Sequence, residues 1–481
     1  MTFDWQQSTS SGTQLAGIQV LETLYSLNEA YTPVPQLASA MPSVSADGLA
    51  YQVPLRQNVK FHNGAMMTAE DVVASLQRWA QVSSNGKAMF DRVGGIRAIS
   101  ASEVHITLSS PYDVVRALAV PISPAAIMPV QVISVLGNDP IGDVTQIVGS
   151  GPYKFVEWRK GQRYALERFA DYRPADNGAT GGLAAARPAT WQRVEVNFVT
   201  DATTRFHSTL AGQYDVGLKI PGDFYSTLQR AENVTAKVVS PFYSNFMLTN
   251  TGKPPFGNQQ VRQAAALALD RKPLADAAHG WPNLYTLNGA IYPAGMGVLS
   301  TQIGVAGYSQ DISEARSLLK NSGYDGRPVT LLTQKEVAEA YNSSIAAAQQ
   351  LEAAGFNVNV DVVEAAVMTA RRKKPETWDL VIAGLGVGYV LPSSHLLLSG
   401  SWPFAGWYGH DGLIKAQLDR WDVASSDAER SLVMDGIQRQ FYSDMPAIKL
   451  NDYAAIDVVS KSIDLGNQTF YWPTWWSAKA P

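Results

Sequence analysis

The sequence contains no cysteine, and this excludes several kinds of site at once. Without a thiol the chain can form no disulfide, no zinc–thiolate or iron–sulfur centre, no cysteine-linked lipid anchor within these residues and no cysteine nucleophile. Long apolar runs are missing too, since none approaches the roughly 18 to 20 residues of a membrane-spanning helix. We therefore expect a water-soluble globular protein.

A surplus of basic charge is also missing. The chain has 38 Lys and Arg residues against 42 Asp and Glu residues, a formal net charge of -4, and no long basic run. Phosphate backbones and anionic lipids attract clustered positive charge, which this sequence does not offer. Nucleic acid is therefore not expected as a partner.

No export leader is visible at the start of the sequence. Met1 is followed directly by Thr2-Phe3-Asp4-Trp5, without a basic stretch or a long apolar stretch. Two explanations stay open at this point: the protein remains inside the cell, or the sequence begins after a leader that has been removed.

Motifs for catalysis and metal binding are absent as well. The six histidines, His395 and His410 among them, lie far apart and form neither H-E-x-x-H nor another metal-ligand spacing. There is no G-x-S-x-G elbow and no glycine-rich phosphate loop. We therefore expect no metal site, no cofactor and no catalytic residue. Because paired carboxylates have no sequence signature, a hydrolase with an unrecognised carboxylate pair stays an alternative.

The 481 residues exceed what one hydrophobic core usually serves, so two or three domains are expected, in part built from discontinuous segments. Helical spacing of apolar residues predicts a helix over 15–26, and an amphipathic helix capped by Thr68 is predicted over 68–81. Residues 49–56 and 102–111 alternate apolar and polar side chains as half-buried strands do. The first part of the chain is therefore predicted to be a mixed α+β lobe.

Farther along the chain, two strand-like runs flank a turn at 159–161, and a third strand is predicted over 191–199. Helices and strands then alternate, including a helix over 261–279. This order is typical of an α/β lobe.

Four blocks follow one another in the sequence: LETLYSLNEAYTPVPQLASAM near the start, YQVPLRQNVKFHNGAMMTAEDVVASLQRW at 51–79, VGSGPYKFVEWRKGQRYALERFADYRP at 148–174 and PPFGNQQVRQAAALALDRKPL at 254–274. Each block also has a structural explanation, since Gly64 suits a turn and Thr68 a helix cap. Their joint order and spacing, and the chain length, resemble the oligopeptide, dipeptide and nickel-binding family of ABC-importer solute-binding proteins, family 5.

This resemblance implies a mixed α/β fold like that of type II periplasmic binding proteins, with two lobes, a hinge and an additional inserted domain. Transferred to this sequence, domain I holds residues 1–21, 141–240 and 456–481. Domain II is expected at 22–140 and domain III at 241–455.

The resemblance also implies a function. A protein of this family is not an enzyme: it captures a small organic ligand between its lobes and delivers it to the permease subunits of an ABC transporter. We expect a monomer in the periplasm, which favours a removed leader over a protein that remains inside the cell. A ligand-sensing domain of a chemoreceptor or regulatory system stays an alternative.

By analogy with the family, three regions face the cleft: the opening loop, the hinge stretch, and the strand that ends near 385 with the segment after it. The expected ligand-binding residues are Ser8, Thr9, Ser10, Ser11, Phe242, Tyr243, Asn245, Arg371, Arg372, Leu385, Gly386, Gly388, Tyr389, Trp402, Trp407 and Tyr408.

One of these regions departs from the peptide-binding members. They place an Asp after a "G-W" strand to pair with a peptide amine, whereas Leu385 stands here at the Trp position and Gly388 at the Asp position. A buried ammonium without a counter-charge is costly, so ordinary free peptides are less expected. Arg371 and Arg372 either bind an acidic group or belong to a solvated charge run.

The expected cleft is thus polar, neutral and aromatic, which suits ring stacking and hydroxyl recognition. The ligand hypothesis is an opine-like conjugate, a sugar-containing molecule or a modified peptide-like molecule.

Overall fold

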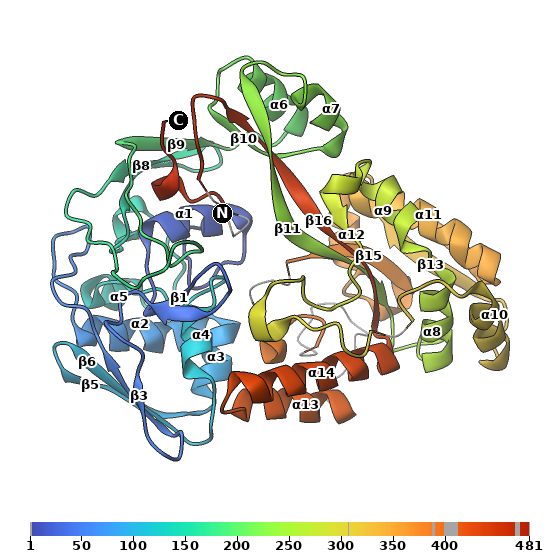
Figure 1. Cartoon of the computed structure of the whole chain (residues 1–481), viewed down its shortest axis with the longest axis horizontal. Helices are drawn as coiled ribbons and strands as arrows, with labels where there is room; N and C mark the ends of the chain where they lie inside the picture. Colours follow the sequence, from blue (N-terminus) through green and yellow to red (C-terminus); the bar gives the residue numbers. More distant parts are fainter. Residues whose placement is uncertain (1, 306, 387–389, 399–411, 467–471, 481) are drawn as a thin grey trace.

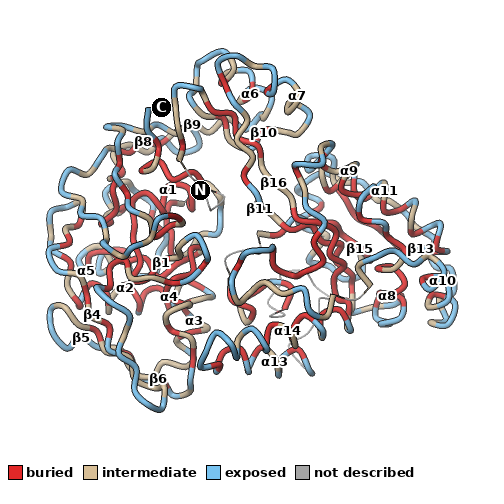
Figure 2. Tube along the Cα trace, in the orientation of Figure 1, coloured by how far each residue is buried: buried red, intermediate tan, exposed pale blue. Residues whose placement is uncertain are grey.

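The computed structural model describes residues 2–305, 307–386, 390–398, 412–466 and 472–480. Two lobes lie side by side, and two long antiparallel strands connect them (Figure 1). These strands are β11 (Val234–Thr249) and β16 (Ala447–Ser460). Figure 2 shows that buried residues gather inside each lobe and along these strands. The family-like fold expected from the sequence, two lobes and a hinge, is therefore present.

The first lobe combines two antiparallel sheets of the order β3-β4-β6-β5 and β7-β8-β9, a small ribbon β1-β2, and five helices. The bounds are α1 (Ser11–Val20), β1 (Tyr25–Leu27), β2 (Pro33–Pro35), β3 (Ser43–Val44), β4 (Ala50–Pro54), α2 (Ala69–Val82), α3 (Ser84–Phe90), β5 (Val93–Ser100), β6 (Glu103–Leu108), α4 (Val114–Ala119), α5 (Val130–Leu136), β7 (Tyr153–Arg159), β8 (Arg163–Arg168) and β9 (Arg193–Asn197).

The second lobe and the connecting layer share one sheet of the order β10-β16-β11-β15-β13-β14, with β12 also pairing with β16. The bounds are α6 (Ala202–Leu210), β10 (Val216–Ile220), α7 (Tyr225–Leu228), α8 (Gln259–Ala268), α9 (Arg271–His279), β12 (Tyr285–Thr286), α10 (Ile312–Asn321), β13 (Pro328–Thr333), α11 (Ala338–Ala354), β14 (Asn357–Val362), α12 (Ala365–Arg371), β15 (Leu380–Leu385), α13 (Gly412–Val423) and α14 (Asp427–Asp444).

A separate hydrophobic core fills the part of the first lobe around α2. It is built from buried side chains between Leu24 and Ile127, among them Phe61 and Trp79, and Leu391 joins it from farther along the chain. The amphipathic pattern that predicts α2 is confirmed, and Asp71 accepts a hydrogen bond from the Thr68 backbone N–H at 2.8 Å. This capping arrangement satisfies a backbone donor that the first turn leaves free.

Two helix predictions need correction. The helix expected over 15–26 ends at Val20, because the following backbone pairs elsewhere: the Gly151 N–H donates to Val20 O, and the Ile127 N–H donates to Glu22 O. The helix expected over 261–279 is two helices, since Asp270 caps a new helix by accepting from the Lys272 N–H. Local spacing does not reveal the long-range pairing that ends α1, whereas the Asp270 cap is a local contact within a continuous helical pattern.

The amino- and carboxyl-terminal segments meet in the first lobe. The Gln19 side chain donates to Pro473 O at 2.8 Å and accepts from the Trp475 N–H at 3.0 Å. The Arg187 guanidinium lies 4.4 Å from the ring centroid of Trp476. The core of this lobe therefore includes residues from both ends of the chain.

Among the described residues, no helix combines the length and apolar character needed to span a bilayer.

Candidate ligand-binding site at the hinge

The pairing of β11 with β16 is interrupted where the two strands pass from one lobe to the other. Val239 pairs with Ala455 and Tyr243 with Tyr453, so the register shifts between these two pairs. Beyond the shift, β11 also pairs with β15, and Asn245 lies opposite Gly384. The interruption marks the hinge, and it brings aromatic and polar side chains of three strands together.

Two tyrosines lie at this hinge against two glycines, Gly384 of β15 and Gly386 just after this strand. The ring centroids of Tyr243 and Tyr453 are 5.9 Å apart. A Cβ atom on Gly384 would clash with the hydroxyl of Tyr453, and one on Gly386 would lie 3.0 Å from Cε1 of Tyr243. Because Gly384 and Gly386 have no side chains, they leave the space that the rings of Tyr453 and Tyr243 occupy.

A histidine extends this aromatic surface. The His279 ring stacks on Tyr453, with centroids 4.7 Å apart and an interplanar angle of 24°. His279 Nε2 lies 2.9 Å from Asn451 Nδ2, which fits an imidazole that accepts from the amide. Burial lowers the pKa of His279 to about 4, against a smaller opposing effect of the Asn451 hydrogen bond. The ring is therefore neutral at pH 7.

Two buried amide atoms beside these rings have no hydrogen-bond partner within the described part of the chain. They are Nδ2 of Asn245 and Oδ1 of Asn451. Buried polar groups are nearly always hydrogen-bonded, to protein, water or ligand. One donor and one acceptor are thus available here. We call Tyr243, Asn245, His279, Asn451 and Tyr453 the hinge cluster.

The charges next to the hinge cluster neutralise each other. Lys449 Nζ lies 2.5 Å from Asp452 Oδ1, and both side chains are buried. Asn288 donates to the other carboxylate oxygen at 2.6 Å, and the Ser244 hydroxyl donates to the first. Burial lowers the pKa of Lys449, and the neighbouring carboxylate opposes that shift. A buried pair satisfied in this way leaves the hinge cluster with neutral hydrogen-bonding groups and rings.

The family of bacterial extracellular solute-binding proteins, family 5, matches residues 32–403, more than half of the chain. The chain belongs to this family.

Curated relatives of this family 5 protein carry related names. A probable peptide ABC transporter periplasmic-binding protein of Sinorhizobium fredii is 24% identical over 475 residues, 96% of this chain and 88% of the relative. A glutathione-binding protein of Pectobacterium atrosepticum is 26% identical over 443 residues, 87% of this chain and 80% of the relative.

Solved structures share the fold. The binding protein AgaA of A. tumefaciens R10, in complex with agropinic acid, superposes with a TM-score of 0.78 at 22% identity, covering 100% of this chain and 96% of that one. The protein NikA of Brucella suis, in complex with Fe(III)-EDTA, gives a TM-score of 0.83 at 19% identity, covering 99% and 97%. The chain is therefore a substrate-binding protein of an ABC importer, in a family of periplasmic transport proteins.

Four of the residues expected to bind ligand come together in this family 5 protein. Tyr243 and Asn245 lie on β11, Leu385 pairs with Ser244, and Gly386 lies against the Tyr243 ring. Phe242 is part of β11, but its side chain is outside what the structure describes. Gly388, Tyr389, Trp402, Trp407 and Tyr408 lie outside the described residues.

The opening residues 8–11 lead into α1, which begins at Ser11. The Ser10 hydroxyl accepts from the Thr13 N–H at 3.3 Å and so caps the helix, and Thr9 is exposed. Ser8 donates to the Thr13 hydroxyl at 3.2 Å, and Lys219 Nζ donates to the Ser11 hydroxyl at 3.1 Å. Helix capping by Ser10 and a tertiary contact of Ser11 account for part of this polar sequence. A role of these residues toward the ligand stays a prediction.

The two adjacent arginines are bound within their own lobe. Arg371 forms an ion pair with Asp361 at 2.7 Å and donates to Thr377 O at 2.7 Å. Arg372 O accepts from Trp378 Nε1 at 3.2 Å, and burial lowers the pKa of the Arg372 side chain. Their contacts fix the segment between α12 and β15, and binding of an acidic ligand group by them stays a prediction.

Sequence reasoning missed His279, Asn451 and Tyr453. A signal was present in the last long strand, where KLNDY places polar residues inside an otherwise apolar stretch. Buried polar residues within a strand indicate a specific hydrogen-bonding role. His279 had no such signal, because it ends an amphipathic helix that reaches the hinge only through the fold.

Proposed function

We propose that this protein captures a small organic ligand at the hinge cluster, and that the ligand is an opine-like or sugar-containing conjugate rather than a peptide with a free amine. The observation that carries the proposal is the neutrality of the hinge cluster. Its neighbouring carboxylate, Asp452, is already neutralised by Lys449. Hydroxyl, amide and ring groups of a ligand can pair with tyrosine and asparagine side chains without a counter-charge.

The proposed mechanism is closure of the two lobes around the ligand. A ligand that contacts both lobes stabilises the closed form through its higher affinity for that form. Ion pairs already join the lobes, Arg92 with Asp422 and Arg116 with Asp427, each at 2.8 Å. The closed monomer would then be recognised by the permease subunits in the periplasm, and no covalent step is required.

Two related structures support this ligand class. AgaA is described in complex with agropinic acid, and MoaA of A. tumefaciens R10, at a TM-score of 0.77 and 18% identity, in complex with mannopinic acid. Other relatives are named for peptides or glutathione. A free α-amine would need an anionic partner, and the described hinge cluster supplies none. This distinction favours the opine-like class for this chain.

Calorimetric titration tests the proposal. Agropinic acid and mannopinic acid are titrated into the protein, in parallel with glutathione and an unmodified tripeptide. We expect heat of binding with at least one of the two conjugates and none with the tripeptide. Tight binding of the tripeptide, with both conjugates inert, would contradict the proposal.

A charge change at the hinge cluster sharpens the test. Asn451→Asp adds a carboxylate beside His279, which should weaken an acidic conjugate at least tenfold and favour ligands that carry an amine. Gln349→Glu adds the same charge on the exposed face of α11 and serves as the control. Equal affinities for the conjugate in both variants would place the ligand elsewhere.

A further inference from the structure

A β-bulge interrupts the pairing of β10 with β16. Gly217 pairs with Val458. The next pair, Ile220 with Ile456, advances three residues along β10 but only two along β16. An extra residue of this kind bends its strand and redirects a side chain, and such bulges often lie next to functional sites. Lys219 belongs to this bulge.

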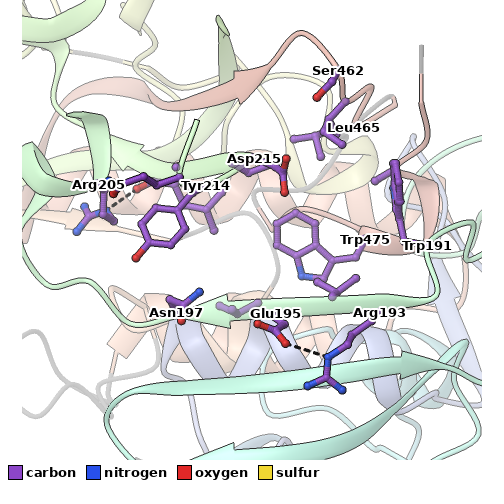
Figure 3. Close-up of a pocket in the computed structure, with 18 of the residues that line it drawn as sticks. Trp191, Arg193, Glu195, Asn197, Arg205, Tyr214, Asp215, Ser462, Leu465 and Trp475 are labelled. Carbon is purple, nitrogen blue, oxygen red and sulfur yellow. Dashed lines mark hydrogen bonds and ion pairs between the residues drawn. The ribbon is translucent and has the colours of Figure 1, made fainter. Parts of the chain in front are cut away.

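The backbone of Lys219 is held in an unusual conformation. Its φ angle is 55°, in the left-handed region that residues with a side chain seldom adopt. Its N–H donates to Asp457 Oδ1 at 2.9 Å, and its carbonyl accepts from Arg205 Nη2 at 3.0 Å. Figure 3 shows Arg205 together with Tyr214 on the wall of a pocket next to β10. Backbone strain that neighbouring groups maintain in this way is concentrated at functional sites, so Lys219 is a candidate for a functional role.

The side chain of Lys219 reaches from β10 to the start of α1. Its Nζ donates to the Ser11 hydroxyl at 3.1 Å. Ser11 is one of the opening residues expected at the cleft, and Lys219 is exposed. Figure 1 shows the amino terminus of the chain, just before α1, next to the two connecting strands. A ligand held at this end of the cleft would therefore meet an accessible ammonium group.

Lys219 also lies in line with the hinge cluster. Side chains alternate along a strand, so Asn451, Tyr453 and Asp457 project from the same face of β16. Between the last two, on that face, stands only the methyl group of Ala455. Tyr453 and Asp457 are four residues apart, which is about 13 Å along an extended strand. Because Asp457 holds the Lys219 backbone, the ammonium continues the row of groups that begins with the hinge cluster.

An acidic ligand needs a counter-charge that the hinge cluster does not provide. An ionised group that leaves water without a partner of opposite charge is costly. His279 is neutral at pH 7, since burial lowers its pKa to about 4. The remaining members of the cluster are tyrosines and asparagines, which offer hydrogen bonds but no positive charge. A carboxylate of the ligand therefore has to find its cation beyond the cluster.

Two cations in and beside the second lobe are already matched by carboxylates of this chain. Lys449 forms an ion pair with Asp452. Arg371 forms one with Asp361. The contact of Lys219 Nζ with a serine hydroxyl is of a different kind, because that acceptor is neutral. A ligand carboxylate in the same place adds the attraction of opposite charges to the hydrogen bond.

We propose that Lys219 is a specificity-determining residue that pairs with a carboxylate of the bound ligand, while the hinge cluster holds its hydroxyl, amide or ring groups. The inference rests on the proposed function and specifies the ligand further, as a conjugate that carries an acidic group. Such a ligand is held at one end beside α1 of the first lobe and at the other by Tyr243 and Tyr453. It therefore contacts both sides of the hinge and stabilises the closed form.

Paired acid and ester ligands test this inference. Agropinic acid, mannopinic acid and the methyl esters of both are titrated calorimetrically into the unmodified protein and into Lys219→Met, which has a side chain of similar length without the charge. We expect Lys219→Met to weaken binding of an acid at least about tenfold and binding of its ester by no more than about twofold. Equal losses for acid and ester would overturn the inference.

Two further variants separate the charge from the structure. Lys219→Arg keeps a positive charge and should retain most of the affinity for the acid. Lys320→Met removes the same charge from the exposed side of α10 and should leave the affinities for acid and ester unchanged. Absence of binding of either acid to the unmodified protein would overturn the proposed function and this inference with it. An unchanged acid affinity in Lys219→Met would overturn this inference alone.

Discussion

Tyr453 keeps its place at the hinge because residue 384 has no side chain. A Cβ at that position would clash with the tyrosine hydroxyl, whereas the next ring atom, Cζ, would lie at 3.2 Å. The hinge cluster therefore depends on Gly384, which contributes space for the Tyr453 ring and no interaction of its own. The residue type at position 384 thus determines where the Tyr453 ring, a proposed ligand-binding group, can lie.

We expect Gly384→Ala to lower the free energy of unfolding by about 1–3 kcal/mol, because the added methyl group displaces the Tyr453 ring. In a Tyr453→Phe background the same substitution should cost less, since the hydroxyl that clashes is gone. Urea unfolding of the four proteins in this double-mutant cycle measures the coupling. Equal losses in both backgrounds would mean that the two residues do not interact.

Asp457 on β16 is a buried acid at the connection between the lobes. It accepts a hydrogen bond from the Lys219 backbone N–H at 2.9 Å. Burial raises its pKa to about 6, while that hydrogen bond and the charges of Lys219 and Lys237 act in the opposite direction. The folded state therefore holds this proton more tightly than the unfolded chain, in which the pKa of an Asp is about 3.9.

Because the pKa is raised on folding, the stabilising effect is complete below pH 4 and is lost as the pH rises through about 6. The loss amounts to as much as about 3 kcal/mol for this group. Asp457→Asn keeps an acceptor for the Lys219 N–H and should remove this part of the pH dependence. Urea unfolding at pH 4, 5, 6 and 7 compares the two proteins; parallel profiles would exclude the effect.

Among the elements, α4 of the first lobe and α14 of the second are joined by four charges. Arg116 contacts Asp113 at 3.2 Å and Asp427 at 2.8 Å, and Arg430 contacts the same two carboxylates at 2.9 and 3.1 Å. Each cation thus meets one carboxylate from each lobe. Networks of this kind contribute more than isolated surface pairs, although solvent at Asp427 screens part of the attraction.

We expect Arg430→Ala to shift the protein toward an open form, because Asp113 then keeps only one of its two partners. Small-angle X-ray scattering at low salt should give a larger radius of gyration than for the unmodified protein, and added salt should reduce the difference. Arg327→Ala removes an ion pair to Asp325 within one lobe and should leave the radius unchanged. Identical scattering for both variants would contradict a role of the network in closure.

The sequence predicts elements well where their pattern is local. The capped helix α2 and the β7–β8 hairpin lie where spacing and turn residues place them. It does not predict the end of α1 at Val20, which depends on partners far along the chain. The break between α8 and α9 has a local cause, the cap at Asp270, but the continuous helical spacing conceals it. The same holds for the hinge cluster. The resemblance to the family predicts Tyr243 and Asn245 as ligand-binding residues, whereas His279 reaches the hinge only through tertiary packing against Tyr453.

At the scale of the whole molecule, the first lobe depends on the last residues of the chain. Truncation after Gly466 removes Trp475 and Trp476 and leaves the Gln19 amide without Pro473 O and the Trp475 N–H. We expect the truncated chain to unfold its first lobe, with loss of protection in α1, while α11 and β13 in the second lobe exchange as before. Hydrogen exchange measured by mass spectrometry checks this, and full protection of α1 would contradict it.

The meeting of the two chain ends also has a kinetic consequence. Gln19 is separated from its partner Pro473 by 454 positions, so this contact carries a large loop-closure cost and cannot form until residue 473 has been synthesised. A chain that is still being synthesised therefore holds an unfinished first lobe until residues 473–475 have been added. Its second lobe has no such requirement, so the two lobes complete their folding at different times.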